Sequence, residues 1–329
     1  MLESALTSPA ADAGSMPDLG EGFSVIADAD GLRPFLMSII SSGDVWLFIA
    51  SNGALTAGRR NPDHALFPYY TDDLLLDQAH TTGGVTLVRG SVDGRPFVWH
   101  PGSPDAALPD AAPRRRWLAK SRLGDEVVFG EDRPDLGLAY RVSWTTGRRF
   151  GLVRRATITN TADQAVDLEL LDGVRNLLPA GVTRQTQNEL SNLLDAYKRS
   201  EIDPATGLGV YSLSSGLTDL AEPAESLHAT VAWGSAAAAP VRLATDRALA
   251  AFARGATPTD DTDARGVRGA YLGVHRLHLE PGQETTLTTV ADTGLDSAAV
   301  ADLAAALADP DALAQALADD LAQTRAKLG

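Results

Sequence analysis

Short runs of hydrophobic residues alternate with polar turns along most of the chain. From about residue 22 to residue 292, the runs are rich in Val, Ile, Thr and aromatic residues, and Gly, Pro, Asn and Asp separate them. This pattern is typical of β-strands joined by turns. Because no regular helical segments separate the runs, the pattern favours a sandwich or barrel over an alternating βαβ fold. We therefore expect a mainly β protein with one large antiparallel β-sandwich over residues 22–292.

Three segments carry turn signals that predict β-hairpins. In residues 84–100, Asp93-Gly94 separates two alternating runs, and this pair favours the positive φ angles of a tight turn. In residues 152–173, the hydrophobic residues of the second run fall on one strand face, and a longer loop precedes them. In residues 274–292, the expected turn is Pro281-Gly282.

The pattern changes to a helical period near the C-terminus. Leu313, Leu317, Leu321 and Leu328 lie on one helical face, and Asp309-Pro310 is a suitable start for the last helix. We expect a helical linker over residues 293–329 whose leucines pack against the sandwich, a second copy or another domain. Residues 1–21 lack the basic and apolar parts of a secretory signal and are expected to form a flexible lead-in.

Charge and composition exclude several classes of partner. The chain has 28 basic and 43 acidic side chains, a net charge of −15, so most of its surface would repel nucleic acid and anionic membranes. No apolar stretch approaches the ~20 residues that span a bilayer. The sequence contains no cysteine, which excludes disulfides and thiolate chemistry. We expect a cytoplasmic protein without a cofactor.

Residues 51–73 hold the densest mixture of polar and aromatic side chains. Aromatic faces that stack on sugar rings, beside side chains that bond hydroxyl groups, are typical of saccharide sites. The alternative is a self-satisfied structural loop in which Arg59 or Arg60 pairs with an aspartate of the segment. Residues 170–201 add further donors. The candidate ligand-binding residues are Arg59, Arg60, Asp63, His64, Tyr69, Tyr70, Asp72, Asp73, Gln185 and Gln187.

A third cluster lies before the run that carries Trp233. Asp219, Glu222, Glu225 and His228 fall within ten residues and could serve proton transfer or a metal. The alternative is loop solvation and capping, and we predict no metal site.

Four segments together resemble a known family. They are SNGALTAGRRNPDHALFPYYTDD, LELLDGVRNLLPAGV, SNLLDAYKRSE and GLGVYSLSSGLTDLAEPAESLHATVAW. Over roughly residues 30–292 the chain resembles the N-terminal domain of proteins related to the family-94 glycoside phosphorylases, the cellobiose and chitobiose phosphorylase group. The resemblance implies a galactose-mutarotase-like sandwich that precedes linker helices and an (α/α)6 catalytic barrel. The family's catalytic acid and phosphate site lie in that barrel, so no catalytic residue carries over to this chain.

The resemblance implies a carbohydrate-interacting and assembly domain. It would act on β-linked glucosides or related oligosaccharides only with a catalytic barrel in cis or trans, as a fragment or as one subunit of a split enzyme. A homodimer is a further expected assembly. Within residues 59–73, we expect Arg59, Arg60, Asp72 and Asp73 to hold the segment together, and His64, Tyr69 and Tyr70 to face a ligand or the barrel.

Two other functions fit the sequence. A stand-alone aldose-1-epimerase-like enzyme needs a carboxylate base and a histidine acid on opposite sides of one sugar. Its candidate histidines are His64, His100, His228, His275 and His278, of which the last two should point to opposite strand faces. The other alternative is a purely structural sandwich, a spacer and dimer surface whose exposed edges a partner domain or a second protomer would cover.

Overall fold

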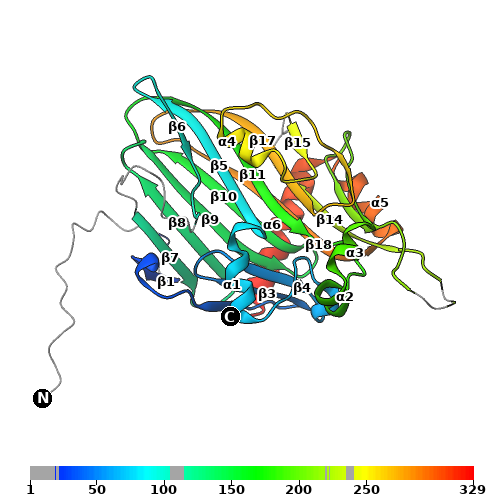
Figure 1. The fold of residues 1–329 in the computed structure, drawn as a ribbon. Coiled ribbons are helices and arrows are strands. Elements are labelled where there is room, and N and C mark those ends of the chain that lie inside the picture. Colours follow the sequence, from blue (N-terminus) through cyan, green and yellow to red (C-terminus); the bar gives the residue numbers. More distant parts are fainter. Residues whose placement is uncertain (1–18, 20–21, 104–114, 219–220, 222, 235–240) are drawn as a thin grey trace, which may run out of the picture.

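Three antiparallel β-sheets make up most of the structure, a computed structural model that describes residues 19, 22–103, 115–218, 221, 223–234 and 241–329 (Figure 1). The largest sheet has ten strands, in the order β1 (Phe23–Ile26), β7 (Arg115–Ser121), β8 (Glu126–Arg133), β9 (Leu138–Gly147), β10 (Gly151–Asn160), β18 (Glu284–Asp296), β14 (His228–Gly234), β13 (Gly209–Leu213), β12 (Lys198–Ile202) and β16 (Asp263–Arg265). The second sheet has five strands, in the order β15 (Val241–Leu243), β17 (Gly269–Leu279), β11 (Val166–Leu177), β5 (Gly83–Val92) and β6 (Arg95–Trp99). The third sheet consists of β2 (Leu36–Ile39), β3 (Val45–Ala50) and β4 (Leu55–Arg59).

The ten-stranded and five-stranded sheets pack face to face. Alternate residues of their strands point inward, as the period of two in a strand requires. In one continuous core, Tyr140 and Ile158 of the larger sheet contact residues of the smaller one. These are Val88, Leu168 and the fully buried Trp99. The predicted mainly β fold, a large antiparallel β-sandwich, is confirmed.

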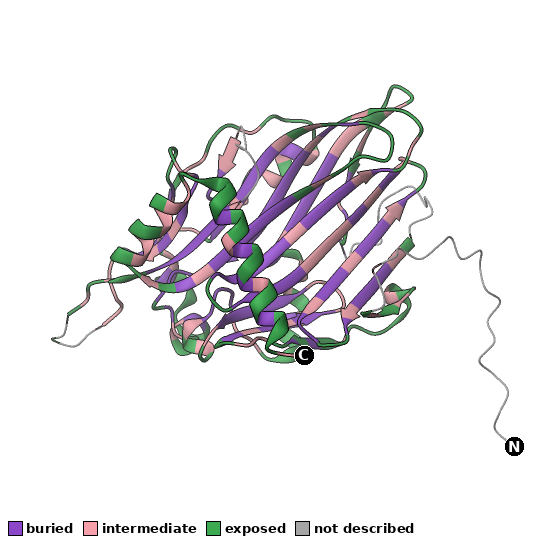
Figure 2. Ribbon diagram, turned by 180° about the vertical axis from the view of Figure 1, so that it is seen from behind, coloured by how far each residue is buried: buried purple, intermediate pink, exposed green. Residues whose placement is uncertain are grey.

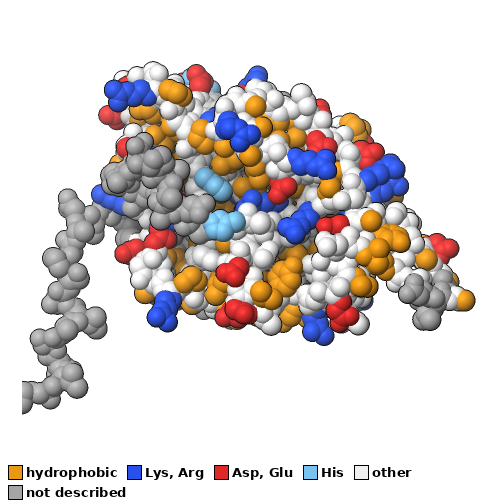
Figure 3. All heavy atoms as spheres, viewed as in Figure 1, with side chains coloured by type: hydrophobic (Ala, Val, Ile, Leu, Met, Phe, Trp, Pro, Cys, Tyr) orange, Lys and Arg blue, Asp and Glu red, His pale blue; other side chains and the backbone are white. Residues whose placement is uncertain are grey.

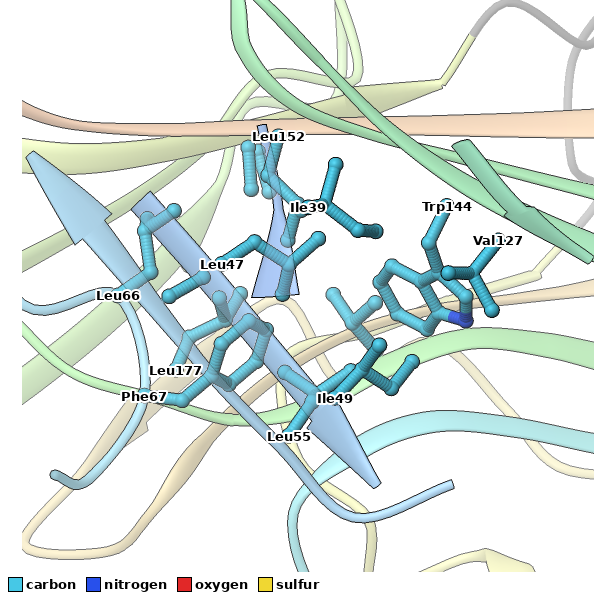
Figure 4. Packing of buried hydrophobic residues seen from close by; sticks show 14 of the residues in the cluster. Ile39, Leu47, Ile49, Leu55, Leu66, Phe67, Val127, Trp144, Leu152 and Leu177 are labelled. Atoms are coloured by element: carbon cyan, nitrogen blue, oxygen red, sulfur yellow. The ribbon is translucent and has the colours of Figure 1, made fainter. Parts of the chain in front are cut away.

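The three-stranded sheet packs across one end of the sandwich. Its strands β3 and β4 contact β9, β10 and β18 of the largest sheet. Figure 4 shows Leu47, Ile49 and Leu55 of this small sheet packed near Trp144 and Leu152. The hydrophobic run in residues 45–50 is therefore strand β3 of a separate sheet, and it is buried because it packs against the sandwich.

Of the three predicted hairpins, the structure confirms one and contradicts two. Asp93 and Gly94 have φ angles of 50° and 74°, and Val92 pairs with Arg95 across this two-residue turn, so the first hairpin is confirmed. The other two predictions are wrong. β10 pairs with β9 and β18 while β11 lies in the five-stranded sheet, and β17 and β18 likewise belong to different sheets. Both turns connect the two layers of the sandwich.

The short helices lie in the connections between strands. They are the 3-10 helices η1 (Ala29–Gly31), η2 (Pro62–His64) and η3 (Asp77–His80), and the α-helices α1 (Asp72–Leu76), α2 (Arg184–Glu189), α3 (Ser191–Asp195) and α4 (Leu249–Ala253). Thr183 caps α2, because its side chain accepts from the backbone N–H of Thr186 at 3.1 Å.

The C-terminal segment forms the predicted helix pair, α5 (Ser297–Ala306) and α6 (Pro310–Ala326). Asp309 caps α6, with Pro310 in its first turn. Figure 2 shows α6 lying across the back of the ten-stranded sheet. Leu313 and Leu317 are buried there in one cluster with Trp233, so the leucine stripe packs against the sandwich of its own chain.

Polar contacts also hold α6 on the sheet. Asp320 is buried and accepts from the backbone N–H groups of Arg149 and Phe150. Arg325 donates to Asp125 at 2.8 Å and to Glu126 at 2.9 Å. Of the helices in the described part of the chain, none is both long and apolar enough to cross a membrane.

Candidate functional site

A cavity of about 700 Å³ lies beside the inner face of the ten-stranded sheet. On the face seen in Figure 3, histidine side chains border a hollow together with arginine and acidic side chains. The larger sheet contributes Arg116, Phe129, Glu131, Tyr140, Val142, Trp144 and Arg154 to the cavity wall. The rest of the wall includes Gly84, Thr86 and Arg175 of the five-stranded sheet. The connections between strands add Asp30 of η1, His80 of η3, and Asn52, His100 and Ser103.

Strand register brings the wall of the larger sheet together. Glu131 pairs with Tyr140, Phe129 with Val142, and Trp144 with Arg154 across neighbouring strands. Each pair therefore places two side chains on the same face. Opposite them, a Cβ atom at Gly84 would lie 2.8 Å from Arg154 Nε and 2.9 Å from the Trp144 ring, so only glycine fits there.

A fully buried ion pair joins the two sheets at the cavity wall. Arg154 donates to both carboxylate oxygens of Asp172, at 2.8 and 2.9 Å, and also to Thr86 and Tyr140. Burial raises the pKa of Tyr140 to about 12, so this hydroxyl stays protonated at neutral pH. Burial alone would lower the pKa of Arg154, but Asp172 outweighs it and raises that pKa. The pair is charge-balanced and cross-links the sandwich.

A second network is built around Glu131, which is only 1% exposed. Its carboxylate accepts from Trp99 Nε1 at 2.8 Å, from the backbone N–H of Gly102 at 2.9 Å and from Arg116 Nε at 2.8 Å. Arg116 also donates to Asp30 at 3.5 Å and to the carbonyl of Ser103. These three donors occupy three of the about four acceptor sites of the carboxylate.

Arg175 differs from Arg116 and Arg154 because it has no bonded carboxylate among the described residues. Like Arg154, it has a buried Nε without a hydrogen-bond partner there. It is 8% exposed and lines the cavity. Its Nη2 donates to the carbonyl of Ala79 at 3.4 Å, and its Nε is buried without a hydrogen-bond partner among the described residues. Burial lowers the pKa of Arg175, and the charge of Asp246 offsets only part of this effect. The wall therefore contains a guanidinium with an unused donor.

The ten candidate residues from the sequence lie elsewhere. The cavity lining includes Ser51, Asn52 and Gly53 from the start of the polar segment, but none of the ten. Arg59 binds Asp44 at 2.6 Å and both carboxylate oxygens of Asp292 at 2.6 and 2.8 Å. Instead of the expected pairing within the segment, Arg59 forms an ion pair between the three-stranded and the ten-stranded sheet, which we call the Arg59 clamp. Burial opposes the charge of Arg59, but the two aspartates raise its pKa.

Several of the other candidates attach the segment to α2. Asp63 accepts from the backbone N–H of Arg184 at 2.9 Å, and Gln187 donates to the hydroxyl of Tyr70 at 3.1 Å. Gln185 contacts Glu189 within α2 itself.

The remaining candidates have local contacts or are exposed. His64 contacts Asn61 at 2.9 Å, and Tyr69 packs edge-on against Trp46. Arg60 is 71% exposed on its side chain, 3.8 Å from Asp44. Asp72 and Asp73 are exposed in the first turn of α1, where a hydrogen bond from Thr71 is the largest cause of the lowered pKa of Asp73. Whether any of the ten contacts a ligand stays a prediction.

The candidate histidines His275 and His278 and the described part of the acidic cluster lie outside this cavity. His275 and His278 line different cavities, as their strand parity predicts. His278 contacts Asp167 at 2.8 Å, and this bond raises its pKa. Asp219 and Glu222 of the third cluster lie outside the described residues. Within the described ranges, no group of three or more His, Asp or Glu side chains could hold a metal ion.

Strand parity could have located part of this wall. Asp172 continues the inward face of Val166, Leu168 and Leu170, and Arg154 shares a face with Leu152 and Ala156. A charged residue on a hydrophobic strand face signals a buried pair. Arg175 has no comparable signal, because it is in regular register with Gly83 and Ala270 and falls on the strand face opposite to that of Asp172.

The chain was also compared with known proteins. No family model matches it, and no curated protein matches it. Solved structures similar to the chain include a polysaccharide lyase (12% identity, TM-score 0.38, 82% of this chain and 33% of that chain) and a bacterial glucoamylase complexed with acarbose (11%, 0.46, 88% and 38%). A candidate aldose 1-epimerase from Escherichia coli K12 gives 12% identity and a TM-score of 0.38 over 80% of this chain and 100% of that one. The chain thus spans 33% of the lyase and 38% of the glucoamylase. At these scores the matches do not bear on what the cavity binds.

Proposed function

We propose that the cavity binds a saccharide and that the chain is the carbohydrate-interacting and assembly domain of a glycoside phosphorylase- or hydrolase-like enzyme. The observation that carries this proposal is the wall itself. Phe129 and Trp144 lie beside Asn52, Ser103 and the histidine side chains around one volume of about 700 Å³. This volume is within the range of ligand pockets, and the mixture of aromatic faces and hydrogen-bonding groups suits sugar rings and hydroxyls.

The resemblance to the family-94 phosphorylase group supports the wider assignment. In that group the sandwich works beside an (α/α)6 barrel that carries the chemistry. The isolated chain should therefore neither phosphorolyse nor hydrolyse β-linked disaccharides. Turnover that a single substitution in this chain abolishes would contradict that part of the proposal.

An epimerase on this cavity is the weaker alternative. His80 and His100 line the cavity, so an acid could be supplied there. Glu131 is a poor base, however, because three donors already occupy its carboxylate. We expect mutarotation of glucose and galactose to stay at the uncatalysed rate in a coupled assay.

Titration calorimetry with cellotriose tests the saccharide site. The substitution Phe129→Ala should weaken binding by about 2- to 12-fold, the effect of losing one aromatic contact. Phe97→Ala is the matched control, because Phe97 is also half-buried but does not line this cavity. If a panel of neutral oligosaccharides fails to bind the wild type, or if both variants behave alike, the cavity is not the saccharide site.

A further inference from the structure

Three arginines line the cavity, and only one lacks a bound carboxylate among the described residues. Arg116 is bonded to Glu131, and Arg154 is bonded to Asp172. Arg175 has the Ala79 carbonyl at 3.4 Å, and its Nε has no partner in the part of the chain that the structure describes. A buried cation without a hydrogen-bonded anion is unfavourable, so an anion at this position would gain from pairing with it.

The backbone holds Arg175 at the cavity. The register of β11 against β17 shifts between Arg175 and Leu177. Asn176 within this bulge has φ 60°, and its amide donates to Thr82 at 2.7 Å. Arg175 itself precedes the shift and pairs in register with Ala270 of β17 and Gly83 of β5, so two strand ladders fix its backbone.

The charges around Arg175 leave it uncompensated. The other acidic residues of the lining, Asp30 and Glu131, are both bonded to Arg116. Asp246 lies close enough to interact with Arg175 through its charge but forms no ion pair or hydrogen bond with it. The lining holds three arginines and two acids, and Asp172 balances Arg154 from outside the lining.

We propose that the cavity binds a saccharide that carries an anionic group, a carboxylate or a phosphate, and that the guanidinium of Arg175 binds this group. The planar fork of an arginine matches both anions and gives stronger hydrogen bonds than a neutral donor. The inference rests on the proposed saccharide site and names the class of saccharide that this site prefers.

Binding measurements on the wild-type protein give the first test. Trigalacturonate and glucose 6-phosphate are titrated at low salt beside cellotriose, glucose and inorganic phosphate. At least one anionic saccharide should bind about 10-fold or more tightly than its neutral counterpart, and added salt should reduce the difference. The carboxylate and phosphate arms show which anion the site takes. No preference for an anionic saccharide, or binding of inorganic phosphate without such a preference, would overturn the inference.

Substitution of Arg175 gives the second test. Arg175→Gln should abolish the anionic preference, which is the ratio of the affinities for the anionic and the neutral saccharide. The exposed Arg268 supplies the control Arg268→Gln, which should keep the preference. A preference that persists in Arg175→Gln contradicts the inference.

A spectroscopic measurement covers the case in which Arg175→Gln does not fold. The Nε–H resonance of Arg175, assigned by its loss in Arg175→Lys, should shift when the anionic saccharide binds the wild type and stay unchanged with the neutral one. An unmoved resonance overturns the inference. Binding of neutral sugars without an anionic preference removes this inference alone, whereas failure to bind any saccharide removes the proposed function as well.

Discussion

Two polar regions of this protein share a composition and differ in how their donors are used. Residues 59–73 and the cavity wall both combine arginine, histidine, tyrosine and aspartate side chains. In the first region, Arg59 meets Asp44 and Asp292, and Asp63 meets the start of α2. In the second, Arg175 lines an open volume and keeps an unused Nε among the described residues.

The comparison shows why polar composition alone does not identify a binding site. Buried polar groups must be matched, and a segment that joins separate sheets needs many such matches. Residues 59–73 connect the three-stranded sheet to α2 and to β18, so their polar side chains serve as cross-links. A ligand site is better recognised by hydrogen-bond donors that line a cavity and have no partner in the protein.

The largest expected effect is at the ion pair behind the cavity. Asp172→Asn leaves Arg154 buried without its counter-ion, so the free energy of unfolding should fall by about 3–5 kcal/mol. Asp167→Asn is the control on the same strand, because the Asp167 side chain is 87% exposed, and it should change little. Urea denaturation measures both variants. Equal losses would mean that the pair does not stabilise the sandwich.

The next effect should come from the clamp at Arg59. Arg59→Gln leaves Asp292, whose side chain is 14% exposed, without its ionic partner, and should cost about 1–3 kcal/mol. Arg60→Gln is the adjacent control, with a side chain 71% exposed, and should leave the unfolding curve in place. Saccharide affinity of folded Arg59→Gln should equal that of the wild type. A loss larger than that of Phe129→Ala would place the segment in the site and remove the distinction between the two regions.

The sequence predicted strand positions better than strand partners. Turn residues such as Asp93-Gly94 and Pro281-Gly282 mark where the chain reverses, and both lie between strands as expected. Only the first turn joins paired strands, since a loop between the layers of a sandwich uses the same residues. The helix pair was predictable down to its Asp309-Pro310 start, because capping and the leucine spacing are local properties.

The candidate site was less predictable because its contacts are long-range. Asp292 lies 233 residues from Arg59, so no local pattern indicates their pairing. Arg154 and Asp172 could have been flagged by their place on hydrophobic strand faces, but their pairing follows from which sheets meet. The unused donor of Arg175 depends on which distant segments surround the end of β11 and on the absence of a bonded acid among the described residues.

A smaller, local effect on stability is expected where α6 packs on the sheet. There, as at Arg59, ion pairs join two separate elements. Burial alone would raise the pKa of Asp125, but bonds from Arg325 and Ser121 lower it below the ordinary 3.8. A lowered folded-state pKa means that this contribution to stability is present above the unfolded-state pKa and is lost as the pH falls through the folded-state value. Amide exchange in α6 should therefore accelerate below about pH 4 relative to that in β10. Asp125→Asn should raise α6 exchange at neutral pH and remove the acid dependence, and an unchanged acid dependence would assign it to other groups.

The smallest effect is expected at Asp72, and it bears most directly on the comparison. The sequence predicts that Asp72 helps to hold residues 59–73 together, but its side chain is exposed in the first turn of the five-residue helix α1. The helix-dipole contribution of so short a helix is small and is screened by salt. Asp72→Asn should leave the melting temperature and the cellotriose affinity unchanged, whereas Leu75→Ala, which removes the buried residue of the same helix, should lower the melting temperature. If Asp72→Asn instead weakens saccharide binding at an unchanged melting temperature, the acidic end of α1 contacts the ligand. The binding surface would then extend from the cavity into residues 59–73, and the two regions would form one site.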